Sequence, residues 1–298
     1  MREITIGTQD NRSVTLRLHR YKRVEDEKIH CEYLINLWIA EGLIPQGEDQ
    51  WEVAWSYLYE LANLCLLEVW EDWSLIKYCK IHDLLLDLAI DIAKVNRCTF
   101  ALEDVFTSET KSDLWRRILV AKKEIDDEVI AKGMVCCPRS LRTLSLHNNP
   151  IEKFEAKFFS PVRLLRVLDL SRTQISTLPP CVGKQKLLKL LNLSWTTIKE
   201  VPICVRSLTS LVMLDLSWCR QLQRLPEWIN EMKSLEHLNV KDCHYELGIH
   251  MPKGISELVS LRVLRSDRLR LSVEDNGLLK LEDVAKLTHL QELSLSSA

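Results

Sequence analysis

The chain has 298 residues, of which 46% are hydrophobic and 28% are charged, and its formal net charge is −2. This length allows two modest domains. The charge gives no electrostatic reason to expect a nucleic-acid or acidic-membrane partner. The longest apolar stretch, at 84–93, is interrupted by Asp87 and Asp91 and is too short to cross a bilayer. We therefore expect a soluble globular protein without direct nucleic-acid binding and without a membrane span.

Ten cysteines are scattered along the chain, and none belongs to a Cys-x-x-Cys pair. The first residues contain no apolar signal-peptide core. Both observations favour reduced thiols in a cytoplasmic or nucleocytoplasmic protein and predict no metal site. Disulfides, or a zinc site that includes Cys136 and Cys137, are the alternative interpretations.

Residues 1–23 give no assignment, and the first predicted elements are two helices. One runs from 33 to 41 and ends at Gly42, a typical C-cap residue. The other begins at Asp49, which forms a capping-box pattern with Glu52, and extends to about residue 67. Its apolar stripe consists of Trp51, Trp55, Leu58, Leu61, Ala62 and Cys65.

Two strands and a further helix follow. The strands, 67–70 and 75–81, flank a turn at 71–74, and the helix runs from Asp83 to about residue 95. Helices, a hairpin and a last helix predict a winged-helix domain over residues 24–100. The last helix carries Asp83, Asp87 and Asp91, so the basic reading helix of a DNA-binding winged helix is not expected.

After a linker at 101–114, the pattern Leu-x-x-Leu-x-Leu fills the rest of the chain. Its seven copies begin at Leu141, Leu165, Leu188, Leu211, Leu235, Leu261 and Leu290. Eight residues after the first leucine, the first five copies carry Asn149, Thr173, Thr196, Cys219 and Cys243. This pattern is typical of leucine-rich repeats. A degenerate copy begins at Trp115, so the predicted repeat domain is 115–298.

Each copy predicts a short strand whose leucines face the core. Stacked parallel strands lie about 4.8 Å apart. The fold class is therefore α/β: a helical winged-helix domain followed by a leucine-rich-repeat solenoid, a curved parallel sheet with loops and helical turns on its convex side. The chain stops directly after a repeat strand without a polar cap, so we expect a C-terminal truncation.

The residues between the leucines should face outward and supply a binding surface. Val167, Leu190 and Met213 align as an apolar ridge, with His237 at the same position one repeat later. Trp195 and Trp218 should be neighbours beside this ridge. The flanking charges are Arg142, Arg166, Lys189 and Arg262. Either the ridge is a partner-binding hot spot, or it packs within the protein. For the flanking charges, a solvated face is the favoured interpretation over an edge of the binding surface.

Several motifs in the first half resemble those of one family. Residues 34–44 (LINLWIAEGLI), 57–68 (YLYELANLCLLE), Ile81-His82-Asp83 and 84–93 (LLLDLAIDIA) occur in this order before the repeats. In this they are similar to plant intracellular nucleotide-binding leucine-rich-repeat disease resistance proteins. Ile81 replaces the methionine of that family's Met-His-Asp motif, and residues 23–29 resemble a remnant of its Phe-Pro-Glu-Asp segment.

This resemblance implies that His82 contacts the phosphates of ADP in an intact receptor and that Asp83 holds the start of the following helix. The alternative is an ordinary N-cap at Asp83 beside a surface histidine. The sequence has no P-loop: Gly183-Lys184 lacks both the leading glycine and the following Ser or Thr. We therefore expect no ADP or ATP cofactor in this chain alone.

The resulting prediction is a non-enzymatic disease resistance protein that recognises a protein partner with its repeats. The partner would be a pathogen effector, a guarded host protein or another receptor domain, and in an intact receptor recognition would be coupled to the ADP/ATP state. A repeat scaffold or decoy that regulates full-length receptors is the alternative function. The repeats read TxIxxLP rather than the NxLxGxIP of extracellular plant receptors, which disfavours that class.

Overall fold

The computed structural model describes residues 3–7, 13–17, 29–45, 47, 49–72, 75–82, 117–119, 139–154, 159–243, 249–252, 254–267 and 281–296. The chain divides into two compact units, Met1–Leu119 and Val120–Ala298. Within the described ranges, no helix is both long and apolar enough to pass through a membrane.

The first unit contains a three-stranded antiparallel sheet and two helices. The sheet has the order β3-β5-β4, with β3 at Ile29–His30, β4 at Leu67–Asp72 and β5 at Leu75–Ile81. The helices are α1 (Cys31–Glu41) and α2 (Gln50–Asn63). A separate antiparallel hairpin, β1 (Glu3–Gly7) with β2 (Ser13–Arg17), occupies the segment that the sequence left unassigned. The two helices and the following β4–β5 hairpin match the predicted winged helix.

The helix ends follow the capping rules. Gly42 has φ 76° in the left-handed region, as expected for a C-cap residue. Asp49 accepts hydrogen bonds from the amides of Trp51 and Glu52 at 3.1 and 3.2 Å, which confirms the N-cap of α2. The predicted end near residue 67 is wrong, because the chain turns at Cys65, which has φ 54°, to enter β4.

The core of the first unit forms where the helices meet the sheet. Ile35 of α1 and Leu58 of α2 are fully buried beside Cys79 of β5. The predicted stripe of α2 is partly wrong: Trp51 and Trp55 are only half-buried and Cys65 is exposed. Ala54, Tyr57, Leu58 and Leu61 are the buried positions of this helix. The predicted helix from Asp83 and the linker 101–114 lie outside the described residues.

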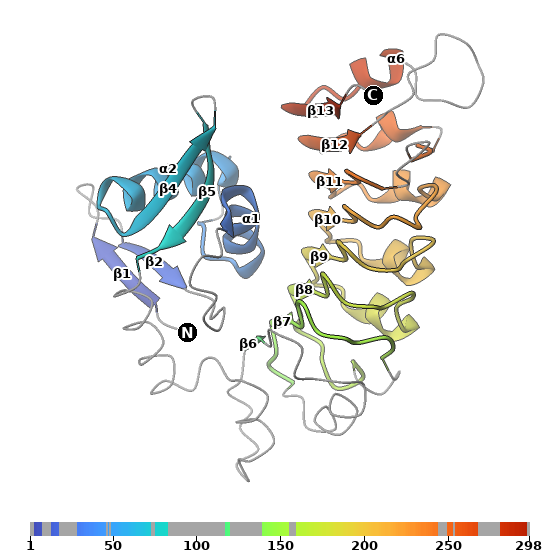
Figure 1. Ribbon diagram of the computed structural model, residues 1–298, viewed down its shortest axis with the longest axis horizontal. Coiled ribbons are helices and arrows are strands. Elements are labelled where there is room, and N and C mark those ends of the chain that lie inside the picture. The colour runs from blue at the N-terminus through green and yellow to red at the C-terminus, as the bar shows by residue number, and fades with distance from the viewer. Residues whose placement is uncertain are drawn as a thin grey trace. The chain divides into compact units, whose positions relative to one another are not determined.

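The second unit is a ladder of short strands, as Figure 1 shows. Its strands are β7 (Thr143–Ser145), β8 (Val167–Asp169), β9 (Leu190–Asn192), β10 (Met213–Asp215), β11 (His237–Asn239), β12 (Val263–Asp267) and β13 (Glu292–Ser296). The last three residues of the first unit, β6 (Arg117–Leu119), are the edge strand of the same sheet. Together these strands form one eight-stranded sheet in sequence order, and β7 to β13 pair in parallel. Seven strands fall on the seven leucine patterns, and β6 falls on the degenerate copy, so the predicted repeat fold is confirmed.

Short helical turns line the side of the solenoid opposite the strands (Figure 1). They are η2 (Pro180–Lys184), η3 (Ile203–Ser207), η4 (Glu227–Glu231), η5 (Ile255–Glu257) and α6 (Leu281–Ala285). Pro179, Pro202 and Pro226 are the N-cap residues of the first three turns. Because proline fixes φ, these residues end each rung at a defined point and start the turn.

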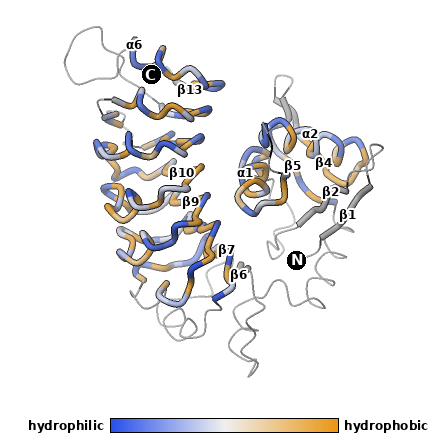
Figure 2. Tube along the Cα trace, turned by 180° about the vertical axis from the view of Figure 1, so that it is seen from behind, coloured by the Kyte–Doolittle hydropathy of each residue, from blue (hydrophilic) through white to orange (hydrophobic). Residues whose placement is uncertain are grey.

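The leucines of each rung fill the interior of the coil. Leu188, Leu191 and Leu193 of one repeat are all fully buried, and the equivalent leucines of neighbouring repeats are buried as well. Figure 2 shows hydrophobic and hydrophilic stretches alternating within the rungs. Burial of one such side chain is worth about 1.5–3 kcal/mol. Since that burial requires a neighbouring rung, stability is a property of the stack.

The ninth residue of each repeat, counted from the first leucine, holds the turn after the strand. Asn149 donates from Nδ2 to the carbonyls of Leu146 and His147, both at 3.0 Å. Thr173 and Thr196 donate from Oγ1 to the sixth residue of their own repeats at 2.7 Å. Cys219 donates its thiol to Leu193, in the preceding repeat, at 3.1 Å. Threonine and cysteine thus take the place of asparagine here by bonding backbone carbonyls with small buried side chains.

Candidate functional site

The third residue of each repeat does not form the exposed ridge that the sequence predicts. Val167, Leu190 and Met213 are only 1%, 0% and 8% exposed. They pair in exact register on adjacent parallel strands, so each side chain covers the flanks of its neighbours. The ridge prediction is therefore wrong, and the alternative, packing within the protein, describes these residues. The edging residues Arg166 and Lys189 are half-buried.

The predicted proximity of Trp195 and Trp218 is confirmed. Their rings stack with centroids 4.3 Å apart and an interplanar angle of 7°. Trp195 is 40% exposed, and Trp218 is half-buried. The stack is thus an aromatic surface on the solenoid that the fold leaves partly open to solvent.

Both tryptophans occupy the eighth position of their repeats, where the backbone is left-handed. Their φ angles are 58° and 60°, and the same position in the other repeats has φ between 56° and 59° at Asn148, Arg172 and Asp242. The amides of Trp195 and Trp218 donate to the carbonyls of Ser217 and Lys241 in the following repeat, at 2.9 and 2.8 Å. These bonds to the next rung hold a conformation that bulky residues adopt only under constraint.

Two arginines cover the tryptophan pair. The guanidinium carbon of Arg172 lies 4.9 Å from the ring centroid of Trp195, and that of Arg220 lies 5.5 Å from the ring centroid of Trp218. Both distances are within cation–π range. Together Arg172, Trp195, Trp218 and Arg220 form what we call the arginine–tryptophan ladder, which runs across repeats two to four.

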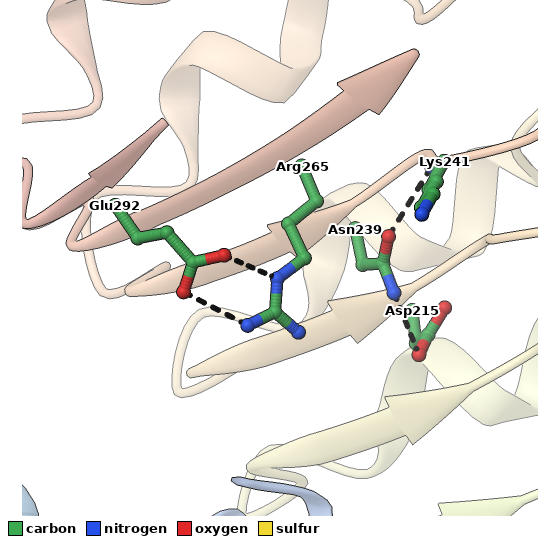
Figure 3. Close-up of polar contacts among 5 residues, drawn as sticks. All are labelled: Asp215, Asn239, Lys241, Arg265 and Glu292. Carbon is green, nitrogen blue, oxygen red and sulfur yellow. Dashed lines mark hydrogen bonds and ion pairs between the residues drawn. The ribbon is translucent and has the colours of Figure 1, made fainter. Parts of the chain in front are cut away.

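The fifth residue of each repeat contributes a polar row beside the strands. Asp169 and Asp215 each accept from the amide and hydroxyl of the serine two residues later, at 2.6–3.0 Å. Figure 3 shows the row continuing: Asn239 donates to Asp215 at 3.2 Å, and Arg265 makes a bidentate contact with Glu292 at 2.8 and 2.9 Å. Burial raises the pKa of Asp215, and the bonds from Ser217 and Asn239 oppose that shift.

His237, a predicted partner-binding residue, lies in the sheet and is only 4% exposed. Burial lowers the pKa of its imidazole to about 3, and the positive charges of Arg265 and Arg262 add to the effect. The imidazole of His237 is therefore neutral and packs in the sheet, and the nearby arginines disfavour its protonation.

A surface depression of about 510 Å³ opens beside the ladder. It is lined by polar and charged residues from the loops after β9 and β10: Lys199, Glu200, Arg220, Gln221, Gln223 and Arg224. Arg220 belongs both to this depression and to the arginine–tryptophan ladder. The two features therefore form one continuous surface.

His82 follows β5 directly, and its side chain is exposed. Its amide donates to the carbonyl of Leu66 at 3.4 Å, which ties this residue to the start of β4. Asp83, the other predicted nucleotide-sensing residue, lies outside the described residues. Of the predicted pair, the structure therefore describes one exposed imidazole at the end of β5.

The sequence interpretation missed the arginines of the ladder, the polar row and the depression. The repeat spacing did indicate one of the ladder arginines, because Arg172 stands 23 residues before Trp195, at the same position of its repeat. The polar row was also readable, because the fifth position of consecutive repeats is Asp169, Asn192, Asp215 and Asn239. Within the described ranges, no three His, Cys, Asp or Glu side chains are grouped as metal ligands.

A three-stranded winged-helix sheet with two helices, followed by a parallel repeat ladder, defines a winged-helix leucine-rich-repeat protein. A family model described as "Leucine-rich repeat region" matches residues 127–298, and one described as "Disease resistance protein Winged helix domain" matches residues 24–89. Neither of these is an enzyme family. Among solved structures, the leucine-rich repeat domain of the type III effector XopL is 20% identical, with 72% of this chain and 81% of that chain covered and a TM-score of 0.46.

Two relatives from Arabidopsis thaliana are similar in sequence. Disease resistance protein RPM1 is 30% identical over 160 residues, which cover 50% of this chain and 16% of that protein. Disease resistance RPP13-like protein 4 is 31% identical over 286 residues, which cover 91% of this chain and 31% of that protein. The chain belongs to the plant nucleotide-binding leucine-rich-repeat disease resistance proteins, and it spans less than a third of the length of these two relatives.

Proposed function

We propose that this protein acts in plant defence by recognising another protein through the repeat surface around Trp195 and Trp218. The relatives supply the defence context, because they are disease resistance proteins. The observation that carries the surface is the stacked tryptophan pair itself, with Trp195 40% exposed. Tryptophan and arginine are the residues most enriched at binding hot spots.

The backbone at these positions strengthens the argument. A left-handed residue that is not glycine costs about 1–2 kcal/mol, and asparagine or aspartate bears the conformation most easily. Asn148 and Asp242 occupy the equivalent positions of other repeats. The fold therefore accepts small polar residues at this position and does not itself require tryptophan. We infer that Trp195 and Trp218 serve a contact of their rings with a partner.

We further propose that His82 serves the nucleotide-dependent switch of a full-length receptor. Its exposed position at the end of β5 leaves the imidazole accessible to a phosphate supplied by another domain. Coupling then requires that a partner bound to the repeats favour one of two receptor states. We place this activity in the cytoplasm, where thiols such as Cys219 and Cys243 stay reduced.

The recognition proposal is tested by Trp195→Asn, which installs the residue that the equivalent position 148 accepts. Ile203→Asn is the matched control, because Ile203 is 66% exposed on a turn at the other side of the repeat. Tagged versions are expressed in leaf tissue, and bound proteins are quantified after proximity labelling. We expect Trp195→Asn alone to lose a defined set of partners and to weaken restriction of pathogen growth. Equal partner sets for both variants would refute the proposal, provided circular dichroism shows both to be folded.

A scaffold or decoy function is the second candidate, because the sequence has no P-loop with which to bind a nucleotide. A decoy should capture the nucleotide-binding domain of a full-length receptor in trans, which co-precipitation of the two tagged chains measures. Calorimetry with ADP tests the premise of both candidate functions, namely that this chain alone binds no nucleotide. We expect no heat of binding to this chain, and micromolar affinity would contradict that expectation.

A further inference from the structure

The depression next to the ladder carries an unbalanced charge. Lys199, Arg220 and Arg224 contribute three positive charges, and Glu200 contributes one negative charge. The surface thus holds two net positive charges in a chain whose formal charge is −2. A local cationic surface on a slightly acidic protein attracts an acidic group to that place rather than to the molecule as a whole.

Two of these cations contrast with several paired cations elsewhere on the described repeats. The side chains of Lys199 and Arg224 make no hydrogen bond or ion pair with any residue that the structure describes. Some other arginine and lysine side chains of the described repeats pair with glutamates of the following repeat. These pairs are Arg206–Glu231 at 2.7 Å, Lys233–Glu257 at 3.1 Å and Arg265–Glu292 at 2.8 Å.

The backbone beneath the depression is fixed. His250 donates its amide to Gln223 and accepts from the amide of Leu225, both at 3.0 Å, around a parallel bridge between Arg224 and His250. The stem of the Arg224 loop is therefore held by the next repeat. A fixed backbone lowers the entropy lost when a ligand orders the side chains above it.

We propose that this surface binds an acidic, extended segment of a partner protein, with its carboxylates at Lys199 and Arg224 and an apolar side chain against Trp195. The inference rests on the proposed recognition function and names the partner chemistry. A nucleic acid fits less well, because the two indoles cover each other and arginines lie over both rings. Bases need free aromatic faces on which to stack.

The test uses the full chain and fluorescein-labelled peptides. The acidic peptide alternates glutamate and phenylalanine over about ten residues, the length of a segment that crosses several rungs. In the neutral peptide, glutamine replaces every glutamate. Anisotropy titrations at low salt should give the acidic peptide an affinity about tenfold higher, an advantage that shrinks as salt rises.

Two charge variants locate the site. Lys199→Glu with Arg224→Glu should weaken acidic-peptide binding about tenfold and leave neutral-peptide binding unchanged. Arg206→Glu with Lys233→Glu changes the net charge equally at already paired cations, and it should bind the acidic peptide nearly as the native chain does. Arg220 is left in place in both variants because it packs on Trp218.

The other possible results each contradict either the acidic-segment inference or the tryptophan surface. Equal binding of the two peptides, or equal loss in both charge variants, would overturn the acidic-segment proposal. If Trp195→Asn abolishes peptide binding while Lys199→Glu with Arg224→Glu has no effect, the tryptophan surface stands and the charge inference fails. The reverse pattern would refute the tryptophan surface instead. Tighter binding of a single-stranded oligothymidine than of the acidic peptide would replace the proposal with nucleic-acid binding.

Discussion

His237 should make the repeat domain sensitive to mild acid. Its imidazole is buried in β11, and burial together with Arg265 and Arg262 lowers its pKa from an ordinary value of 6.5 to about 3. In the unfolded chain the imidazole regains water and its ordinary pKa. Between these two pKa values the unfolded state binds the proton and the folded state does not. Stability therefore falls as pH falls from about 6.5 toward 3.

The size of the effect at pH 5 depends on the pKa of the unfolded state rather than on the exact folded value. At pH 5 the unfolded imidazole is about 1.5 pH units below its pKa, while the folded one stays neutral. Each unit corresponds to about 1.4 kcal/mol, so His237 should cost the folded state about 2 kcal/mol relative to pH 7.5.

Urea unfolding followed by far-ultraviolet circular dichroism at pH 7.5 and pH 5.0 measures this contribution. His237→Met removes the titrating group and installs the side chain that is already buried at the aligned Met213. The variant should lose about 2 kcal/mol less than the native chain between the two pH values. Val263→Met, at the same position of the next strand, controls for the change in volume. An identical pH dependence in the native chain and His237→Met would refute the reasoning.

Three further substitutions test the fold. Leu191→Ala should destabilise the solenoid by about 2–5 kcal/mol in urea unfolding, because this leucine is fully buried and alanine leaves a cavity. Gly183→Ala should cost about 1–3 kcal/mol in the same assay, because a Cβ there would lie 2.8 Å from the carbonyl oxygen of Cys204; an unchanged midpoint would contradict that close approach. Asp49→Ala should cost about 1 kcal/mol by removing the N-cap of α2, seen as faster hydrogen exchange in its first turn.

The repeat architecture could be predicted because its signal is local and periodic. The leucines that define each rung, such as Leu188, Leu191 and Leu193, are spaced to reach one interior, and the strands form where the pattern places them. Gly42 and Asp49 were predictable for a similar reason, since a cap depends on residues within one turn. The end of α2 was harder to predict, because the turn at Cys65 is set by the entry of the chain into β4 and not by a local residue preference.

The candidate site could be predicted only in part. A two-residue strand period gives the side on which Leu190 points, but not how completely Val167 and Met213 cover it. The proximity of the tryptophans followed from the repeat spacing because both occupy one position. The depression did not follow, because it joins Lys199 and Arg224 from different positions of two repeats. That neither side chain pairs with a residue in the described part of the chain also becomes visible only in three dimensions.

At the eighth position of the repeats the fold requires a left-handed backbone but tolerates different side chains. The backbone there is left-handed in five successive repeats, and a carbonyl of the next rung fixes the amide wherever Asn148, Arg172, Trp195 or Trp218 stands. Asparagine satisfies this geometry with little strain, whereas a bulky ring does so at a cost of about 1–2 kcal/mol. A stacked aromatic pair returns only about 0.5–1.5 kcal/mol beyond its burial. The cation–π contacts of Arg172 and Arg220 add about 0.5–1 kcal/mol each, so the contacts within the chain offset only part of the strain at the two sites. The recognition function proposed above accounts for the rest. Local conflict of this kind is concentrated at functional sites.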